Sequence, residues 1–452
     1  MPITERVAAS YRDPSGYVVS EEGIYKRVVT HHGLSDYERY ISSGLHKQLV
    51  KAGLILNFEE EGTPRTEDTW ARLLVPEQID FISYPYEWVF DEFRDAALLT
   101  LEIQREALAR ELTLKDASPY NVQFRGSRPV FIDTLSFEKH DGGPWIAYEQ
   151  FCREFLGPMA MMSYCSAGAA RHLRVELGGF PLSYVSSALP LSSYLHPGLL
   201  LHLHLHARAT KSDRHGYQRG GAVSQSNLID SLRSAIERLS RPKSSTAWPE
   251  YYADSRFYSP AAVHSKRIAV RRLASDLQPL TVCDVGTNTG LFAKEFAASG
   301  ASVFAIDSDA YCINELYLDQ RRDSSTRLLP LLVDVANPSP ALGFGLKHTR
   351  SFFDRMQADL VLCLGLIHHL RFRENLPLDQ IAETFARLGR RLLIEFVPGG
   401  DPSAELMRNG RPGFEDYDKA SFLDEFSRYY CLLWQRPICG SGRVLFLFER
   451  HA

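Results

Sequence analysis

The second half of the chain alternates strand-like and helix-like segments, and this alternation is the feature that most constrains its fold. Short apolar runs typical of buried strands are separated by amphipathic stretches long enough to form helices. Parallel strands need such crossovers, and right-handed crossovers place the helices on both faces of the sheet. We therefore predict a doubly wound, mostly parallel α/β sheet. Its expected strands are Thr281–Val285, Ser302–Ile306, Arg327–Val333, Ala358–Leu364 and Arg391–Phe396.

The last part of the chain is expected to complete this sheet with an antiparallel pair at one edge. Helices are predicted over Gly290–Ala298, Leu378–Leu388 and Tyr417–Tyr429. The segment CLLWQRPICGSGRVLFLFER then reads as two strands around the turn Cys439–Gly442. Together with the parallel strands, this pair makes a seven-stranded sheet.

Composition is that of an ordinary globular protein, with 44% apolar and 23% charged residues in a chain of 452. This length allows two or three domains. The formal net charge of −4 gives no electrostatic footprint for nucleic acid, so a nucleic-acid partner is not expected. Seven cysteines without a CxxC pair lack the common zinc spacings and suit a reducing cytoplasm.

No targeting or membrane-spanning segment is predicted. The opening residues, MPITERVAASYRDPSG, are charged early and lack the apolar core of a signal peptide. The most apolar region, Ser186–Ala207, is interrupted by Pro190, Pro197 and four histidines, which argues against a transmembrane helix. We therefore expect a cytoplasmic protein without a membrane partner, and the sequence leaves its oligomeric state open.

Two halves are expected on either side of a polar, basic stretch. The run KSDRHGYQRGGAVSQS has no periodicity and many turn-forming residues, and a short helix, NLIDSLRSAIERL, follows it. We predict an N-terminal α+β domain over residues 1–207, a linker with the short helix over 208–245, and the α/β domain over 246–452.

The loop after the first parallel strand, VCDVGTNTG, is the expected ligand site, because open α/β sheets bind ligands beyond the carboxyl ends of their strands. A phosphate loop needs a lysine after its glycines, but Leu291 and Phe292 follow Gly290. The dinucleotide fingerprint needs three glycines, and this loop has only Gly286 and Gly290. Two readings remain: a loop that binds S-adenosylmethionine, and glycines that serve only the turn.

Carboxylates at three strand ends favour the S-adenosylmethionine reading. Asp284 offers negative charge toward the ammonium of the methionine end, while the glycines let the main chain approach closely. Asp307 follows the second strand, where a carboxylate can accept both ribose hydroxyls, and Asp309 is its nearest competitor. Asp334, after the third strand, can meet the adenine amino group.

This half resembles the class I, seven-stranded, Rossmann-like S-adenosylmethionine-dependent methyltransferases. The likeness spans roughly Trp248 to the C-terminus and rests on VCDVGTNTG, VFAIDSD, LLVDVANPSP, LCLGLIHHL, RLLIEFVP and the closing strand pair, in this order. It implies S-adenosyl-L-methionine as the cofactor. It also implies these contacts: the methionine end with Gly286, Asn288 and Gly290, the ribose with Asp307, and the adenine with Asp334.

Candidate catalytic residues follow the fourth strand, in GLIHHL. His368 and His369 are the expected general bases for an acceptor that must lose a proton, although paired histidines at this place also serve packing or the start of a helix. Glu395, after the fifth strand, either orients an acceptor or caps the next loop. Three tyrosines lie upstream of the first strand: Tyr251, Tyr252 and Tyr258. They either cover the cofactor or pack the two domains together.

The first half holds a second pattern, LTLKDASPYNVQFRGSRPVFID, which spaces Asp116, Asn121 and Asp133 as a catalytic loop followed by a metal-binding aspartate. This segment resembles the catalytic lobe of protein kinases and aminoglycoside phosphotransferases, which implies that Asp116 contacts an acceptor hydroxyl and that the other two hold magnesium. Lys26, in a predicted hairpin, is the candidate phosphate-pairing lysine, but no glycine-rich loop precedes it. The alternative is that these side chains stabilise turns.

The run LLLHLHLHA places His202, His204 and His206 on one face if it forms a strand. Such a face either binds a transition metal or is the outer face of a half-buried strand, and we expect no metal. 

The whole chain also has a likeness to a group of bacterial methyltransferases that includes nodulation proteins. Our leading hypothesis is therefore a two-domain methyltransferase whose N-terminal half helps to select the acceptor, with a small molecule favoured. The alternatives are a phosphotransferase with a regulatory methyltransferase-like half and a non-catalytic module that binds S-adenosylmethionine.

Overall fold

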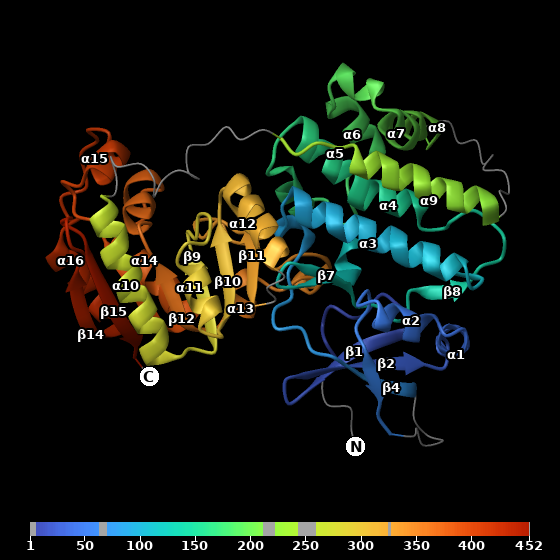
Figure 1. Cartoon of the computed structure of the whole chain (residues 1–452), viewed down its shortest axis with the longest axis horizontal. Coiled ribbons are helices and arrows are strands. Elements are labelled where there is room, and N and C mark those ends of the chain that lie inside the picture. Colours follow the sequence, from blue (N-terminus) through green and yellow to red (C-terminus); the bar gives the residue numbers. More distant parts are fainter. Residues whose placement is uncertain (1–5, 63–69, 211–221, 243–258, 324–326, 452) are drawn as a thin grey trace. The chain divides into compact units, whose positions relative to one another are not determined.

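The computed structural model describes residues 6–62, 70–210, 222–242, 259–323 and 327–451 (Figure 1). The chain forms two compact units. Unit 1 comprises Met1–Lys243 together with Ala341–Arg350, and unit 2 comprises Ser244–Pro340 and Ser351–Ala452. The chain therefore leaves unit 2 once, adds a short segment to unit 1, and returns.

Unit 1 begins with a small antiparallel sheet in the order β1-β2-β4-β3. The hairpin predicted around Lys26 is confirmed, since β1 and β2 pair from Gly16 with Val29 to Glu21 with Ile24. Helices α1 and α2 follow β2 and bury their apolar sides. The bounds are β1 Gly16–Glu21, β2 Ile24–Thr30, α1 Leu34–Ser42, α2 Leu45–Lys51, β3 Phe58–Glu60 and β4 Trp70–Pro76.

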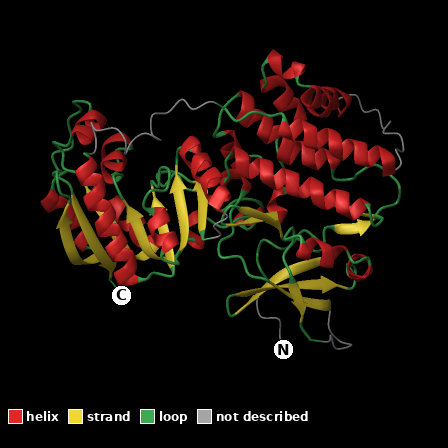
Figure 2. Ribbon diagram, viewed as in Figure 1, coloured by secondary structure: helices red, strands yellow, loops and turns green. Residues whose placement is uncertain are grey.

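A helical layer built around the long helix α3 (Phe90–Leu108) makes up the rest of unit 1 (Figure 2). Helix α9 (Ala222–Glu237) packs along α3, and Arg233 pairs with Glu102 across the two helices at 2.5 Å. Two hairpin-like pairs lie after α3: β5 Leu112–Leu114 with β8 Phe137–Lys139, and β6 Val122–Arg125 with β7 Arg128–Phe131. The remaining elements are η1 Pro85–Glu87, η2 Pro119–Asn121, α4 Tyr148–Phe151, η3 Cys152–Leu156, α5 Gly157–Tyr164, η4 Ala169–Arg174, α6 Leu182–Ala188, η5 Leu191–Leu195, α7 Pro197–Leu199, η6 Leu200–Leu205 and α8 His206–Thr210.

The expected histidine-bearing strand is wrong, because this run is helical. Residues Leu200–Leu205 form η6, a turn of π-helix that continues into α8. His202 bonds Tyr148 and Ser231 at 2.9 and 2.8 Å, and both rings of the buried pair, His202 and His204, are satisfied by hydroxyl groups. Within the described ranges, no group of three His, Cys, Asp or Glu side chains could hold a metal ion.

Unit 2 is the predicted seven-stranded sheet, in the order β11-β10-β9-β12-β13-β15-β14. Its first five strands are parallel, and β15 runs antiparallel to both β13 and β14, so the expected edge pair is confirmed. The strand bounds are β9 Thr281–Val285, β10 Ser302–Asp307, β11 Leu328–Leu332, β12 Ala358–Cys363, β13 Gly389–Phe396, β14 Tyr430–Pro437 and β15 Val444–Arg450.

Helices cover both faces of this sheet, as crossover connections require (Figure 2). The strands are buried along most of their length, and one core cluster joins β9, β10, β12 and β15 to α10 and α11. The helix bounds are α10 Pro260–Leu277, α11 Ala293–Ala298, α12 Ala310–Asp323, α13 Phe352–Arg355, η9 His369–Arg373, α14 Leu378–Leu388, α15 Pro402–Arg408 and α16 Lys419–Ser427. The short turn η8 (Phe344–Leu346) lies in the segment that belongs to unit 1.

Among the residues that the structure describes, no helix is both long and apolar enough to cross a membrane.

The buried histidine of η6 makes stability depend on pH. Burial lowers the pKa of His202 from 6.5 to about 4, so the unfolded chain binds a proton that the folded protein excludes. Stability therefore falls as the pH drops from about 6.5 toward 4, and we expect His202 to account for about 2–3 kcal/mol of the loss. Urea denaturation at pH 7 and pH 4 should show a smaller loss in His202→Gln than in the native protein. The exposed His172→Gln variant should keep the native loss, and equal losses in all three proteins would contradict this account.

Candidate functional site

The carboxyl ends of β9, β10, β11 and β12 meet at one edge of the unit 2 sheet. From β9 the chain builds outward through β10 to β11 and then returns to place β12 on the other side of β9. Residue pairs confirm the common direction, with Ile306 beside Val285 and Cys363 also beside Val285. The reversal of strand order at β9 is where open α/β sheets bind ligands.

The loop after β9 turns sharply because three of its residues adopt left-handed backbone angles. Gly286, Asn288 and Gly290 have φ values of 75°, 55° and 78°. A side chain at Gly290 would meet Leu316 at 2.5 Å, and one at Gly286 would meet Leu366 at 3.1 Å. The glycines are thus required by both the turn and close packing.

Asp307, the last residue of β10, ties this loop to the next one. Its carboxylate accepts the main-chain N–H of Asn288 at 2.8 Å and that of Asp309 at 2.9 Å. Burial raises the pKa of Asp307 to about 6. Asp309, the competitor considered from the sequence, accepts the main-chain N–H of Tyr311 and Cys312 at the start of α12, so it caps that helix.

Four of the six predicted cofactor residues line one cleft at this edge: Gly286, Asn288, Asp307 and Asp334. Asp334 follows β11 and accepts the main-chain N–H of Ala336 at 2.9 Å, which holds its carboxylate in the turn. The other residues of the cleft are Val285, Ser308, Asp309, Val333, Val335, Leu364, Gly365, Leu366, His369, Leu370, Arg373 and Glu374.

The other two predicted cofactor residues, Asp284 and Gly290, do not line the cleft but contact residues of the loop and of α12. Asp284 is buried within β9 and accepts the Thr287 hydroxyl at 2.8 Å. Burial raises the pKa of Asp284 to about 6. Gly290 packs against Leu316 of α12. Asp284 therefore fixes the loop through Thr287.

The two candidate histidines occupy different places. His369 begins η9 and lines the cleft, and burial lowers its pKa to about 4, so its ring is neutral near pH 7. His368 is fully buried, and its pKa is also lowered by burial. Among the described residues, neither ring nitrogen of His368 has a hydrogen-bond partner. Only His369 is in a position to touch a ligand in the cleft.

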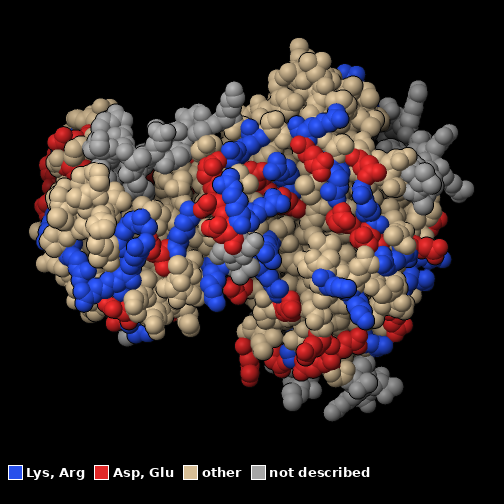
Figure 3. Space-filling model, viewed as in Figure 1, with Lys and Arg blue, Asp and Glu red and all other residues tan. Residues whose placement is uncertain are grey.

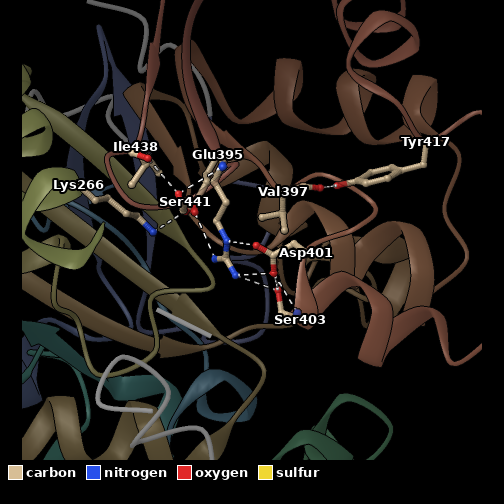
Figure 4. A network of polar contacts seen from close by, with 9 residues as sticks. Lys266, Glu395, Val397, Asp401, Ser403, Tyr417, Ile438 and Ser441 are labelled. Carbon is tan, nitrogen blue, oxygen red and sulfur yellow. Dashed lines mark hydrogen bonds and ion pairs between the residues drawn. The ribbon is translucent and has the colours of Figure 1, made fainter. Parts of the chain in front are cut away.

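A fully buried network of charges lies at the carboxyl end of β13 (Figure 4). Lys266 of α10 bonds Glu395 at 2.5 Å, and the Arg443 guanidinium lies 3.4 Å from the other oxygen of Glu395. Arg443 also makes a two-point contact with Asp401 at 2.7 and 2.9 Å and bonds Ser403 at 3.0 Å. Burial lowers the pKa of Lys266, against the attraction of Glu395.

From the sequence, Glu395 was expected either to orient an acceptor or to cap the next loop, and the network shows a different use of its carboxylate. The residue that caps the next helix, α15, is Asp401, which accepts the main-chain N–H of Ser403 at 2.9 Å. Glu395 instead joins α10, β13 and the start of β15 through its two cations. Our reading of the sequence missed Lys266 and Arg443. Lys266 could have been found, because it falls on the buried stripe of α10 with Ala262, Ala269, Val270 and Leu273.

The phosphotransferase-like residues also come together, in unit 1. Asp116 accepts Ser118 N–H at 3.0 Å and the Gln150 amide at 2.7 Å, while Asn121 and Asp133 share the hydroxyl of Ser136 at 3.3 and 2.5 Å. Burial, with the nearby charge of Asp133, raises the pKa of Asp116. These bonds match the turn-stabilising alternative.

A cation already occupies the carboxylate expected to hold magnesium. Arg27 pairs with Asp133 at 2.6 Å. Lys26, the candidate phosphate-pairing lysine, instead pairs with Glu21 and Glu61 at 2.6 Å each. Neighbouring residues of a strand point to opposite faces, so Lys26 and Arg27 cannot both face Asp133.

The upstream tyrosines Tyr251, Tyr252 and Tyr258 lie outside the described residues.

Comparisons with known proteins agree with this geometry. Residues 252–427 match a family model described as a methyltransferase domain. Nodulation protein NoeA of Rhizobium meliloti (strain 1021) is 30% identical over 466 residues, covering 99% of this chain and 97% of NoeA.

Solved structures were matched as well. The bifunctional kinase-methyltransferase WbdD is 17% identical, with a TM-score of 0.33, over 45% of this chain and 42% of WbdD. The N-methyltransferase NodS from Bradyrhizobium japonicum WM9, in complex with S-adenosyl-L-homocysteine, is 10% identical, with a TM-score of 0.34, over 46% of this chain and 97% of NodS. Both TM-scores are low, whereas the family model and NoeA match this chain at the level of sequence.

Breaking the buried network should destabilise unit 2. Lys266→Met removes the 2.5 Å partner of the fully buried Glu395, and removing one member of a buried ion pair costs about 3–5 kcal/mol. The double variant Lys266→Met/Glu395→Gln should recover part of this loss, because it also removes the negative charge that lost this partner. Urea denaturation measures both changes. The surface variant Lys294→Met, which breaks a pair with Asp319, is the matched control and should cost about 1 kcal/mol or less. A Lys266→Met protein as stable as this control would refute a structural role for the network.

Proposed function

Because the chain belongs to the family of nodulation protein NoeA and carries a methyltransferase domain, we propose that it transfers a methyl group from S-adenosyl-L-methionine to a small-molecule acceptor. The observation that carries the proposal is the convergence of Gly286, Asn288, Asp307 and Asp334 on one cleft at the carboxyl ends of the strands. These residues come from three separate loops, and a shared ligand accounts for their meeting.

The residues of the cleft fit S-adenosyl-L-methionine. The bare main chain at Gly286 leaves room for the methionine end beside Leu366, where any side chain would collide. Each oxygen of Asp307 accepts one main-chain N–H and keeps a lone pair for a ribose hydroxyl. Asp334 lies at the end of the neighbouring strand, where we assign the adenine contact. Asp284 acts through Thr287 and its negative charge.

When bound, the cofactor would supply a methyl group on a sulfonium: the acceptor atom would bond the methyl carbon in line as the carbon–sulfur bond breaks, and S-adenosyl-L-homocysteine would leave. His369 is the residue we assign as general base, since its ring lines the cleft and its lowered pKa keeps it neutral near pH 7. His368 has no face on the cleft, and we assign it no catalytic role. The aliphatic side chains of Leu366 and Leu370 shield the reacting centre from water on the same side.

The acceptor is proposed to be a small molecule. The net charge of −4 gives no general attraction for nucleic acid. Arg373 and Glu374 place one charge of each sign at the cleft, which suits an acceptor that carries polar groups. We propose that unit 1 contributes to acceptor choice, and that Asp116, Asn121 and the buried Asp133 serve its architecture, since Arg27 neutralises Asp133.

Removing the carboxylate that we assign to the ribose should strongly weaken cofactor binding. Asp307→Ala deletes the acceptor for both ribose hydroxyls and also frees two loop N–H groups, so we expect binding of S-adenosyl-L-homocysteine to weaken by about 100-fold or more. Isothermal titration calorimetry on the intact protein measures this change. Asp319→Ala, on the outer side of α12, is the control and should bind as the native protein does. Failure of the native protein to bind S-adenosyl-L-homocysteine would end the proposal, and unchanged binding by Asp307→Ala would remove Asp307 from the site.

Loss of the assigned base should slow methyl transfer without weakening cofactor binding. In His369→Gln, we expect the rate to fall by about 100-fold, because a general base contributes at least this factor. The assay follows tritium transfer from the labelled cofactor to the small-molecule fraction of a bacterial extract, with His264→Gln, exposed on α10, as the control. Equal rates in both variants would show that His369 is not the base. Cofactor binding by the native protein without any transfer would instead favour a non-catalytic binding module.

A further inference from the structure

The stretch Leu177–Ala207 in unit 1 contains no Asp, Glu, Lys or Arg, and the methyltransferase site does not use it. Glu176 is the last charged residue before it, and Arg208 is the first one after it. It folds into the short elements α6, η5, α7, η6 and the start of α8, which pack on one another. Figure 3 shows the surface over α6 and α7 almost entirely in the colour of uncharged residues.

The polarity of this region is inverted relative to an ordinary surface helix. In η6, His202 and His204 are buried, with 1% and 0% exposure, while Leu201 and Leu205 are 51% and 44% exposed. A globular protein normally turns leucines inward and histidines outward. Here the histidines are consumed by internal hydrogen bonds: His204, for example, bonds the hydroxyls of Ser186 and Ser193, each at 2.9 Å. The outer surface is therefore left to aliphatic side chains.

Two more leucine side chains of this stretch are almost fully exposed to solvent. Leu191 and Leu195, at the two ends of η5, are 85% and 84% exposed, and Tyr184 of α6 is 52% exposed. Pro190 and Pro197 precede or begin the two helical turns and restrict their backbone. We call the outward side chains of this region the uncharged face; they are Tyr184, Leu191, Leu195, Leu201 and Leu205.

Basic side chains border the uncharged face. Arg238 directly follows α9, which packs on α7, and Arg208 lies in α8, which continues from η6; both arginine side chains are exposed. Within the described part of the chain, neither arginine forms an ion pair with a carboxylate. Glu149 lies near His206, so the border also holds one acidic side chain.

We propose that the uncharged face docks this protein on the surface of a lipid bilayer that contains anionic lipid. Protruding leucines in a stretch without charged side chains match the acyl region just below the headgroups, and the bordering arginines match anionic headgroups. A protein partner would be expected to engage several aromatic or arginine anchors in pockets, whereas four of the five side chains of this face are exposed leucines. The longest helix of the face, α6, has seven residues and extends about 10 Å, so the contact is interfacial.

This proposal revises the expectation, drawn from the sequence, that no membrane partner exists. That expectation was derived from the prolines and histidines that prevent a spanning helix. The same prolines shape the exposed turns, and the same histidines are hidden inside. The proposal does not depend on the proposed methyl transfer, because none of its residues lines the cofactor cleft.

Co-sedimentation of the intact protein with vesicles tests the proposal. We expect binding to vesicles of three parts phosphatidylcholine and one part phosphatidylglycerol, and weaker binding to phosphatidylcholine alone. The variant Leu191→Ser/Leu195→Ser should lower the partition coefficient by about tenfold or more, because two large apolar side chains no longer enter the bilayer. Leu280→Ser, equally exposed but in unit 2, is the matched control and should bind as the native protein does. Because Leu191 and Leu195 lie in unit 1 and the cofactor cleft lies in unit 2, the fold of the double variant is checked by its circular dichroism and thermal unfolding, which should match those of the native protein.

Two results would overturn the proposal. One is native protein that stays in the supernatant with both vesicle types. The other is a Leu191→Ser/Leu195→Ser variant that sediments with vesicles as the native protein does. A native dimer that this variant dissociates, without vesicle binding, would assign the face to self-association instead. A second probe, Leu195→Trp, should show a blue-shifted emission on addition of the mixed vesicles, and an unshifted spectrum would exclude insertion at this turn.

Discussion

Everything in unit 2 depends on the parallel order of its central strands, which brings four carboxyl ends to one edge. Because β10 and β12 flank β9 on opposite sides, the loops that follow them line one cleft together with the loop that follows β9. The glycine loop has left-handed angles at Gly286 and Asn288, and its N–H groups at Gly286 and Thr287 bond the Ile306 carbonyl of β10. Asp307 then secures that loop through its N–H groups. One strand order thus yields both the cleft and the carboxylate we assign to the ribose.

The buried charges around Glu395 do a different task from the carboxylates of the cleft. Desolvation makes a buried ion pair a poor source of net stability, and apolar side chains of similar volume would serve a core as well. The hydrogen-bonded ion pairs of Lys266, Glu395 and Arg443 require specific angles and distances. They therefore fix the position of α10 relative to β13 and β15. Arg443 then extends this order to Asp401 at the start of α15. The side of the site beyond β13 is held by these bonds.

The sequence predicted the secondary-structure elements that have a regular apolar pattern and the carboxylates that directly follow strands. It missed the side chains whose partners lie far away along the chain. The bounds of β9 and α14 were correct to the residue, because apolar periodicity and turn residues are local signals. Asp307 and Asp334 were placed because each follows a predicted strand. Arg443 meets Glu395 only after the edge pair folds back, so no local pattern announced it. The histidine run failed for a related reason: alternation indicated a strand, but Pro197 starts a helical turn and hydroxyls from elsewhere satisfy the rings.

The two units therefore employ buried polar groups in contrasting ways. In unit 2, polar groups gather where strands end, and several of them face the cleft, so chemistry belongs there. In unit 1, several polar groups are matched to one another: Arg27 to Asp133, and His204 to two serines. Because Arg27 already pairs with Asp133, the carboxylate expected to hold magnesium, unit 1 offers little for phosphoryl transfer, but it can present an outer surface free of charge over residues 177–207. That difference supports the proposals that the reaction takes place in unit 2 and that unit 1 serves recognition, whether of an acceptor or of the surface on which the acceptor is met.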